Sequence, residues 1–160
     1  MKVYFQKIYP EATLPTRGSQ YAAGWDLSAA HSGIIGPGQR MVVKTGLRMA
    51  IEVEDGDGIP EGILPVAKVC SRSGLAAKQG VFVLNSPGII DYDYRGELMV
   101  ILHNAGEKAF AFMQGDRVAQ LLFEYVAIPD SIEVEEVPVD TERGEGGLGS
   151  TGVGNVKAAA

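Results

Sequence analysis

The sequence predicts an all-β fold, a sandwich or a barrel, for most of its 160 residues. Its 21 glycines and 8 prolines interrupt the chain at short intervals, so that only short apolar runs lie between them. Turn-forming sequences separate these runs, among them Gly36-Pro-Gly38, Ser86-Pro-Gly88 and Asn104-Ala-Gly106. Short runs with turns of this kind at regular spacing are typical of β-sandwiches and barrels.

The apolar runs predict strands in chain order, which are residues 2–8, 41–44, 47–53, 63–71, 81–84, 98–103, 108–112 and 117–126. The last run is apolar enough for a helix, but Gly115 before it, Pro129 after it and its length favour a buried strand. Residues 75–78 predict one helical turn. Valine and glutamate alternate over 132–137, which predicts an edge strand that leads into a mobile arm.

Composition and charge exclude several functional classes. A formal net charge of −6 argues against a nucleic-acid-binding surface, which needs a basic field. No apolar run approaches the length of a membrane span, and Lys7 interrupts the first apolar stretch, so we expect no membrane contact, no signal peptide and a cytoplasmic location. Cys70 is the single cysteine and is expected to be a small buried side chain. His31 and His103 are too few for a zinc site or a histidine-based triad.

The segment from Ser71 to Ala76 combines an arginine, two hydroxyls and a glycine where a strand ends and a helical turn begins. This arrangement places Ser73 and backbone N–H groups where an anion can bind. A simple helix N-cap explains the same residues equally well. Further along, Gln120 is polar within an apolar strand, so its amide needs a partner, either a neighbouring backbone group or a ligand.

The segment from Asn85 to Glu97 is the densest in polar and titratable residues. Pro87-Gly88 predicts a turn, so we expect the flanking residues to form a hairpin whose exposed backbone groups can pair with the edge of a flat base. Asp91 follows two isoleucines, which would partly desolvate its carboxylate and suit it to general-base chemistry. The ring of Tyr94 offers a flat surface for a sugar.

The glycine-rich stretch 143–152 has a composition that suits a polyphosphate. Glycines let backbone N–H groups approach a ligand closely, Ser150 and Thr151 supply hydroxyls, and Arg143 supplies a guanidinium. The stretch is not a P-loop, because it lacks the Gly-Lys-Ser/Thr ending. A glycine- and serine-rich tail without fixed structure has the same composition.

Five segments resemble, in order, the five motifs of the trimeric dUTP pyrophosphatases (dUTPases). They are Ala23–Leu27, Arg72–Ala76, Gly88–Gly96, Gly115–Gln120 and Arg143–Gly152. Two positions depart from the family, which usually has tyrosine in place of Trp25 and phenylalanine in place of Leu148. Leu148 can cover a bound uracil by apolar contact, but it loses the stacking geometry of an aromatic ring.

The resemblance implies a β jelly roll, of barrel or sandwich type, over residues 1–127 and a flexible C-terminal arm over 128–160. It implies a homotrimer whose sites are shared between subunits, with the arm of one chain closing the site of another over residues 143–152. The implied reaction is hydrolysis of dUTP to dUMP and pyrophosphate with Mg²⁺, which limits uracil incorporation into DNA and supplies dUMP for thymidylate synthesis. Phosphate oxygens and waters would hold the metal, so no direct protein ligand is expected, and Asp26 would organise the phosphate side or the outer waters of Mg²⁺.

The resemblance also assigns roles to individual residues, with Asp91 activating the attacking water. The residues assigned to the phosphates are Arg72, Ser73, Gly74, Gln120, Arg143, Gly149, Ser150 and Thr151; those assigned to the nucleoside are Asn85, Gly88, Ile89, Ile90, Tyr94, Met99 and Leu148. Asp93, Arg95 and Arg117 are expected to brace the hairpin and the subunit contacts. A dCTP deaminase on the same fold lacks the glycine-rich closing segment, and a non-catalytic nucleotide-binding regulator need not keep Asp91, so both alternatives are disfavoured.

Overall fold

The computed structural model describes residues 1–54, 58–138 and 140–146. Contacts divide the chain into two units, Met1–Pro129 and Asp130–Ala160. The first unit contains all the helices and strands of the described residues: β1 (Lys2–Lys7), β2 (Thr16–Arg17), β3 (Trp25–Ser28), β4 (Gly33–Ile35), β5 (Arg40–Glu52), β6 (Ile63–Cys70), α1 (Ser73–Gln79), β7 (Val81–Val83), β8 (Gly88–Ile90), β9 (Glu97–Asn104), β10 (Phe110–Phe112) and β11 (Arg117–Ala127). The all-β prediction is confirmed.

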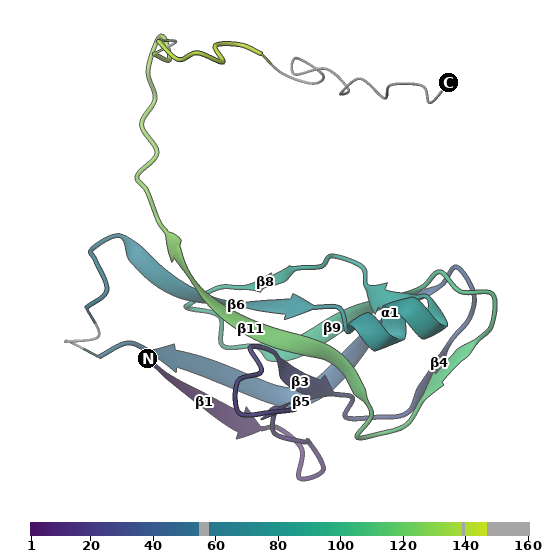
Figure 1. Cartoon of the computed structure of the whole chain (residues 1–160). Helices are drawn as coiled ribbons and strands as arrows, with labels where there is room; N and C mark the ends of the chain where they lie inside the picture. The colour runs from purple at the N-terminus through teal and green to yellow at the C-terminus, as the bar shows by residue number, and fades with distance from the viewer. Residues whose placement is uncertain (55–57, 139, 147–160) are drawn as a thin grey trace, which may run out of the picture. The chain divides into compact units, whose positions relative to one another are not determined.

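The strands form three antiparallel sheets. One large sheet has the order β1-β5-β9-β7, the other has the order β2-β3-β11-β6-β8, and β10 pairs with β4. Figure 1 shows the two large sheets as two layers, with α1 following the end of β6. None of the described residues form a helix with the length and hydropathy that a membrane crossing requires.

Apolar side chains that alternate along the strands build the core with one face and a pocket wall with the opposite face. In β9, Leu98, Val100 and Leu102 are at most 1% exposed, whereas Met99 is 42% exposed. Successive side chains of a strand point to opposite faces, so one sequence pattern serves both purposes. Each fully buried aliphatic side chain of this set contributes roughly 1.5–3 kcal/mol to folding.

Strand β5 is one continuous strand where the sequence predicted two, 41–44 and 47–53. Gly46 has a φ of 69°, and the pairing of β5 with β9 shifts register around it, so the glycine forms a bulge within the strand. The polar groups at the bulge are satisfied locally. Thr45 Oγ1 donates to the carbonyl oxygen of Leu98 (2.7 Å), and the Gly46 N–H donates to Glu97 Oε1 (3.0 Å).

The remaining predicted strands of the first unit are confirmed, and 117–126 forms β11 and not a helix. The sequence missed β2, β3, β4 and β8 as strands, because two to four residues are too few to display an alternating pattern. The helical turn predicted at 75–78 is the longer α1, which ends at Gly80 with a left-handed φ of 66°.

The hairpin predicted around Pro87-Gly88 is wrong. Strand β7, before the turn, pairs with β9, whereas β8, after the turn, pairs with β6. The turn therefore carries the chain from one large sheet to the other. Turn-forming residues specify a local reversal of direction, but they do not specify which strand each flank will pair with.

The edge strand predicted over 132–137 is also wrong, because the described residues of 128–140 form no strand. Ile132, Val134 and Val137 are 79%, 55% and 69% exposed. An alternating segment becomes a strand only beside another strand edge, and no described strand pairs with this one.

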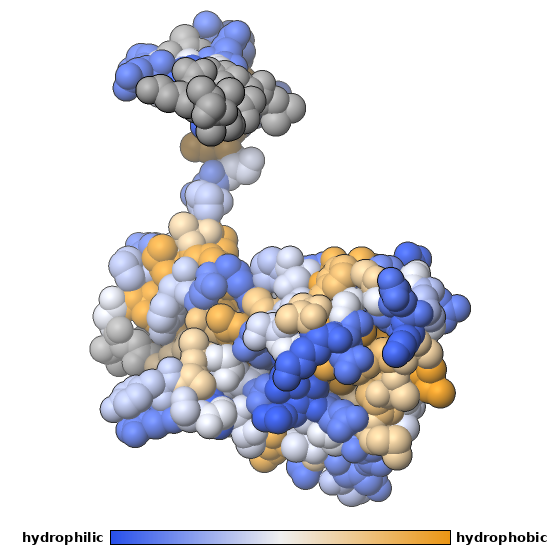
Figure 2. Space-filling view, turned by 45° about the vertical axis from the view of Figure 1, so that its right-hand side comes forward, coloured by the Kyte–Doolittle hydropathy of each residue, from blue (hydrophilic) through white to orange (hydrophobic). Residues whose placement is uncertain are grey.

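On the face of the first unit drawn in Figure 2, apolar residues lie in separate groups between polar ones.

Candidate active site

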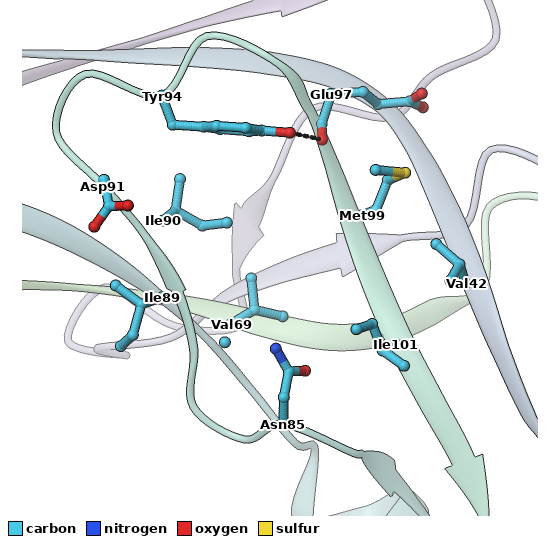
Figure 3. A pocket seen from close by; sticks show the side chains of 11 residues that line it. Val42, Val69, Asn85, Ile89, Ile90, Asp91, Tyr94, Glu97, Met99 and Ile101 are labelled. Atoms are coloured by element: carbon cyan, nitrogen blue, oxygen red, sulfur yellow. Dashed lines mark hydrogen bonds between the residues drawn. The ribbon is translucent and has the colours of Figure 1, made fainter.

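Seven residues assigned to the nucleoside or to catalysis line one pocket of about 340 Å³ (Figure 3). They are Asn85, Gly88, Ile89, Ile90, Asp91, Tyr94 and Met99, and Val42, Val69, Glu97 and Ile101 complete the lining. Figure 3 shows Tyr94 and Asn85 at opposite ends of the pocket, with Ile90 and Met99 facing each other between them. The walls are apolar and the polar groups are few, as in most small-molecule sites.

Hydrogen bonds within one turn fix Asp91 and Tyr94 relative to each other. The Tyr94 N–H donates to the carbonyl oxygen of Asp91 (3.1 Å), and the Tyr94 hydroxyl donates to the carbonyl oxygen of Glu97 (3.0 Å). Nη1 of Arg95 donates to the carbonyl oxygens of Tyr92 (2.8 Å) and Tyr94 (3.0 Å). Arg95 therefore braces the turn that carries the carboxylate and the ring.

Asp91 is exposed in the single chain, although two isoleucines precede it. Ile89 is itself 51% exposed, because alternate residues of β8 face opposite sides of the sheet. Both isoleucines line the pocket, and Figure 3 shows the Ile90 side chain pointing toward its middle. The carboxylate of a single chain is thus open to water at the mouth of the pocket.

A second pocket, of about 320 Å³, gathers the four phosphate-assigned residues of the first unit, Arg72, Ser73, Gly74 and Gln120, together with Asp26, Leu75 and Lys78. The alternative that Ser73 caps α1 is wrong, because Arg72 is the N-cap residue and no side chain caps the helix. The Ser73 hydroxyl bonds to no other group among the described residues, so it is available to a ligand.

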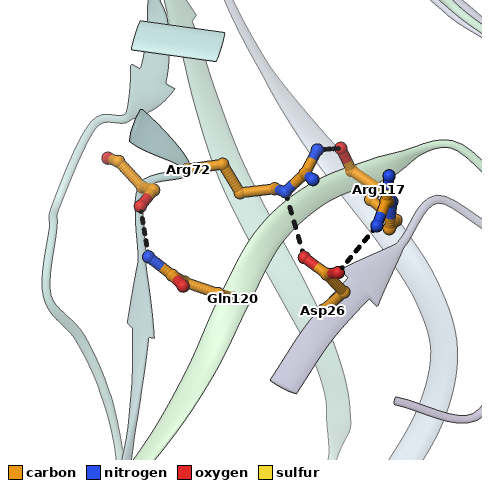
Figure 4. Close-up of polar contacts among 5 residues, drawn as sticks. Asp26, Arg72, Arg117 and Gln120 are labelled. Atoms are coloured by element: carbon orange, nitrogen blue, oxygen red, sulfur yellow. Dashed lines mark hydrogen bonds and ion pairs between the residues drawn. The ribbon is translucent and has the colours of Figure 1, made fainter. Parts of the chain in front are cut away.

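Asp26 holds two arginines with its two carboxylate oxygens (Figure 4). Oδ1 accepts from Nε of Arg72 (3.0 Å), and Oδ2 accepts from Nη1 of Arg117 (3.1 Å). Nη1 of Arg72 also donates to the carbonyl oxygen of Arg117 (2.8 Å). A guanidinium has five N–H donors, so Arg72 is anchored by two and retains three. Arg117 thus braces Asp26.

The Gln120 amide has a backbone partner, one of the two kinds of partner that the sequence left open. Its Nε2 donates to the carbonyl oxygen of Ser71 (2.9 Å). Cys70 of β6 pairs with Gln120 of β11. The sequence predicted a buried cysteine, but Cys70 is only half-buried. Burial raises the pKa of the Cys70 thiol above its ordinary value, with the neighbouring Lys68 opposing the shift.

Lys78 lines the second pocket, although the sequence analysis did not name it as a site residue. Gly74 and Lys78 are four residues apart in α1, so they lie on one face of the helix, and this spacing could have identified it. Val42 and Ile101 line the first pocket and pair with each other between β5 and β9. No local pattern reveals such a pair, because it depends on strand register.

The glycine-rich segment belongs to the second unit. Nε of Arg143 donates to the carbonyl oxygen of Gly146 (2.8 Å), which closes a turn within the segment. Leu148, Gly149, Ser150 and Thr151 lie outside the described residues. Among the described residues, no three His, Cys, Asp or Glu side chains form a group that could hold a metal ion.

The two pockets lie far apart within one chain. Ile90, which precedes Asp91, pairs with Ala67, five residues before Arg72, and this offset corresponds to roughly 17 Å along the sheet. Arg72 then reaches to Asp26 in β3, and β3 and β8 are three strand spacings apart, or roughly 14 Å. The carboxylate of Asp91 and the anchored guanidinium of Arg72 in one chain therefore lie in separate pockets.

A sequence model of the dUTPase family matches residues 10–152, which include both pockets and the whole glycine-rich segment. The chain belongs to the dUTPase family. It is 44% identical over 152 residues to deoxyuridine 5'-triphosphate nucleotidohydrolase from Nautilia profundicola, which covers 95% of this chain and 99% of that protein. It is 43% identical over 148 residues to the enzyme of the same name from Mus musculus, and this match covers 92% of this chain and 83% of the mouse protein.

The fold comparison agrees with the sequence comparison. The dUTPase of Staphylococcus bacteriophage 80alpha, solved with dUpNHpp, is similar to this chain with a TM-score of 0.79 and 26% identity. The similarity covers 95% of this chain and 99% of the phage chain. The jelly roll expected for a dUTPase is thus confirmed.

Proposed function

We propose that this dUTPase hydrolyses dUTP to dUMP and pyrophosphate, with Asp91 as the general base. The observation that carries the proposal is the braced turn, which fixes Asp91 and Tyr94 at one mouth of a pocket lined by apolar side chains. The reaction lowers dUTP, which limits uracil incorporation into DNA, and it supplies dUMP for thymidylate synthesis.

The first pocket binds the nucleoside in this proposal. Asn85 and the backbone at Gly88 hydrogen-bond to the uracil edge, while Ile90 and Met99 pack against the base. Tyr94 lies beneath the deoxyribose, where a 2′-hydroxyl would collide with the ring. A base that lacks the matching polar edge is rejected strongly at such a site, because it leaves polar atoms of the site unpaired.

The second pocket binds phosphate oxygens through Arg72, Ser73, Lys78 and Gln120. Mg²⁺ fits this site as an ion carried by the triphosphate, because both oxygens of Asp26 already accept from guanidinium groups. When bound, Mg²⁺ neutralises charge on the triphosphate and on the departing pyrophosphate. Asp26 contributes by fixing Arg72. Residues 143 and 148–151 complete the grip on the γ-phosphate and cover the base.

The chemical step is an in-line displacement at the α-phosphorus. The Asp91 carboxylate accepts a proton from a water molecule as the water oxygen forms a bond to the α-phosphorus. The bond between the α-phosphorus and the bridging oxygen breaks, and that oxygen leaves with the pyrophosphate. General-base assistance of this kind contributes about 10² to 10⁴ in rate.

The active unit in this proposal is a homotrimer with three shared sites. The offset between Asp91 and Arg72 supports sharing, because one nucleotide cannot reach both residues of a single chain. In the trimer, the first pocket of one chain faces the second pocket of a neighbour, and the glycine-rich segment closes over both. The exposed carboxylate of Asp91 then becomes covered.

Hydrolysis assays with dUTP, UTP, dTTP and dCTP, following pyrophosphate and ammonia separately, test the function. We expect pyrophosphate release from dUTP alone. Ammonia release from dCTP would show a deaminase, and binding of dUTP without turnover would show a regulator. Sedimentation equilibrium tests the assembly, and a monomer with full activity would refute shared sites.

A further inference from the structure

Residue 96 is a glycine, although its backbone does not require one. Gly96 is not among the glycines with a positive φ, so an L-amino acid could adopt its conformation without backbone strain. The space beside it is the constraint. A Cβ built on Gly96 would lie 2.5 Å from Cζ and 3.0 Å from Cε2 of the Tyr94 ring, and closer still to the hydroxyl oxygen.

The Tyr94 ring is held against this glycine by its hydroxyl, which donates to the carbonyl oxygen of Glu97 at 3.0 Å. Glu97 is anchored in turn, because its Oε1 accepts from the Gly46 N–H of β5 at 3.0 Å. In Figure 3 the ring lies between the chain segment that joins Tyr94 to Glu97 and the pocket-lining side chains of Ile90 and Met99. A side chain on that segment would therefore press the ring toward the pocket.

We propose that Gly96 is a positioning residue for the substrate: by lacking a side chain, it keeps the Tyr94 ring withdrawn and the sugar end of the pocket open. This inference rests on the proposed function, because it assumes that the deoxyribose occupies the space in front of the ring. It assigns to Gly96 an effect on binding that is transmitted entirely through Tyr94.

A double-mutant cycle between positions 96 and 94 tests the inference. In G96A, the methyl group displaces the ring, and we expect the Kd for dUpNHpp and the KM for dUTP to rise about tenfold or more, with a smaller change in kcat. In Y94L, no ring is present to be displaced, so adding G96A should change the Kd less than twofold relative to Y94L alone. G18A is the control, because a Cβ at Gly18 meets nothing within 4 Å.

Each outcome decides the inference. A Kd for G96A equal to that of wild type overturns it, and so does an equal rise in both backgrounds, which would show that residue 96 acts through the backbone. A fall in unfolding temperature of the same size in G96A and in the double variant would likewise assign Gly96 to the fold. If wild type fails to hydrolyse dUTP, the proposed function fails; if wild type hydrolyses dUTP and G96A binds normally, only the present inference fails.

Discussion

Gly24 in the turn before β3 lies directly against the side-chain amide of Gln120 in β11. A Cβ built on Gly24 would be 3.2 Å from Cδ of Gln120 and closer still to Oε1. Gly24 is not among the glycines with a positive φ, so the neighbouring amide and not the backbone requires the glycine. The first and fourth family motifs therefore meet through van der Waals contact at the second pocket.

We predict that G24A displaces the Gln120 amide from the carbonyl oxygen of Ser71. Loss of that hydrogen bond should lower the free energy of unfolding by about 1 kcal/mol. The kcat/KM for dUTP should fall about tenfold, because in the proposed function the Gln120 amide binds phosphate oxygens and G24A moves it. Urea unfolding and steady-state kinetics measure the two effects, with G18A as the control. Unchanged kinetics in G24A would show that Gln120 does not contribute to substrate binding.

Asp26 offers a test of whether the anchoring of Arg72 matters. D26N keeps the side-chain shape but replaces one acceptor oxygen with a donor, so one of the two guanidinium contacts is lost. We expect about 1–3 kcal/mol less stability and a KM for dUTP about tenfold higher. E124Q is the matched comparison, because it removes the more exposed pair between Lys68 and Glu124. We expect less than about 1 kcal/mol for that pair. Equal effects of the two substitutions would argue against a special role for Asp26.

Asp91 carries the chemistry in the proposed mechanism. D91N removes the proton acceptor without changing the size of the side chain, so kcat for dUTP should fall by about 10² to 10⁴. The Kd for dUpNHpp, measured by calorimetry, should stay within about threefold. D93N is the neighbouring control, since Asp93 lines neither pocket. Near wild-type turnover in D91N would show that another group activates the water.

The raised pKa of Cys70 predicts slow labelling of its thiol. Because burial favours the neutral thiol over the thiolate, less thiolate is present at pH 8 than in a free cysteine. The rate of reaction with a disulfide reagent should therefore be lower in the folded protein, and its midpoint on a pH profile should lie above that of free cysteine. Unfolded protein provides the reference, because Cys70 is the single cysteine. Equal folded and unfolded rates at pH 8 would contradict the shift.

Removal of residues 141–160 tests the closing segment. The truncated chain keeps every residue that lines the two pockets, so dUMP should bind with an affinity within about threefold of wild type. Turnover of dUTP should fall at least about 100-fold, because the phosphate contacts and the cover over the site are lost. L148F in the full chain is the complementary variant, and its aromatic ring should lower the KM for dUTP. Full activity of the truncated chain would show that residues 141–160 have no role in the reaction.

The long strands were predictable because their sequences alternate over many residues. In β9, the alternating positions Leu98, Val100 and Leu102 mark the buried face directly. In β11, the apolar run is long enough to distinguish a strand from a loop. Strand β8 has only three residues and was missed. The valines near 132–137 alternate equally well but form no strand among the described residues, because alternation does not provide a neighbouring edge.

The site could be predicted where its residues are close in sequence. Asp91 and Tyr94 belong to one turn, and Arg72 and Ser73 follow one strand, so local motifs locate both groups. Contacts across the sheets escaped prediction, since they depend on register. The pairing of Val42 with Ile101, and the contact of Gly24 with Gln120, join segments between 59 and 96 residues apart.

The offset between Asp91 and Arg72 has a genetic consequence. If each working site takes its carboxylate from one chain and its guanidinium from another, then damage to either residue affects a different half of the site. Chains carrying D91N and chains carrying R72A would each be inactive alone. Unfolded and refolded together, they would form mixed assemblies in which some sites receive both intact halves. Two null alleles of this enzyme, present in one cell, would then complement each other.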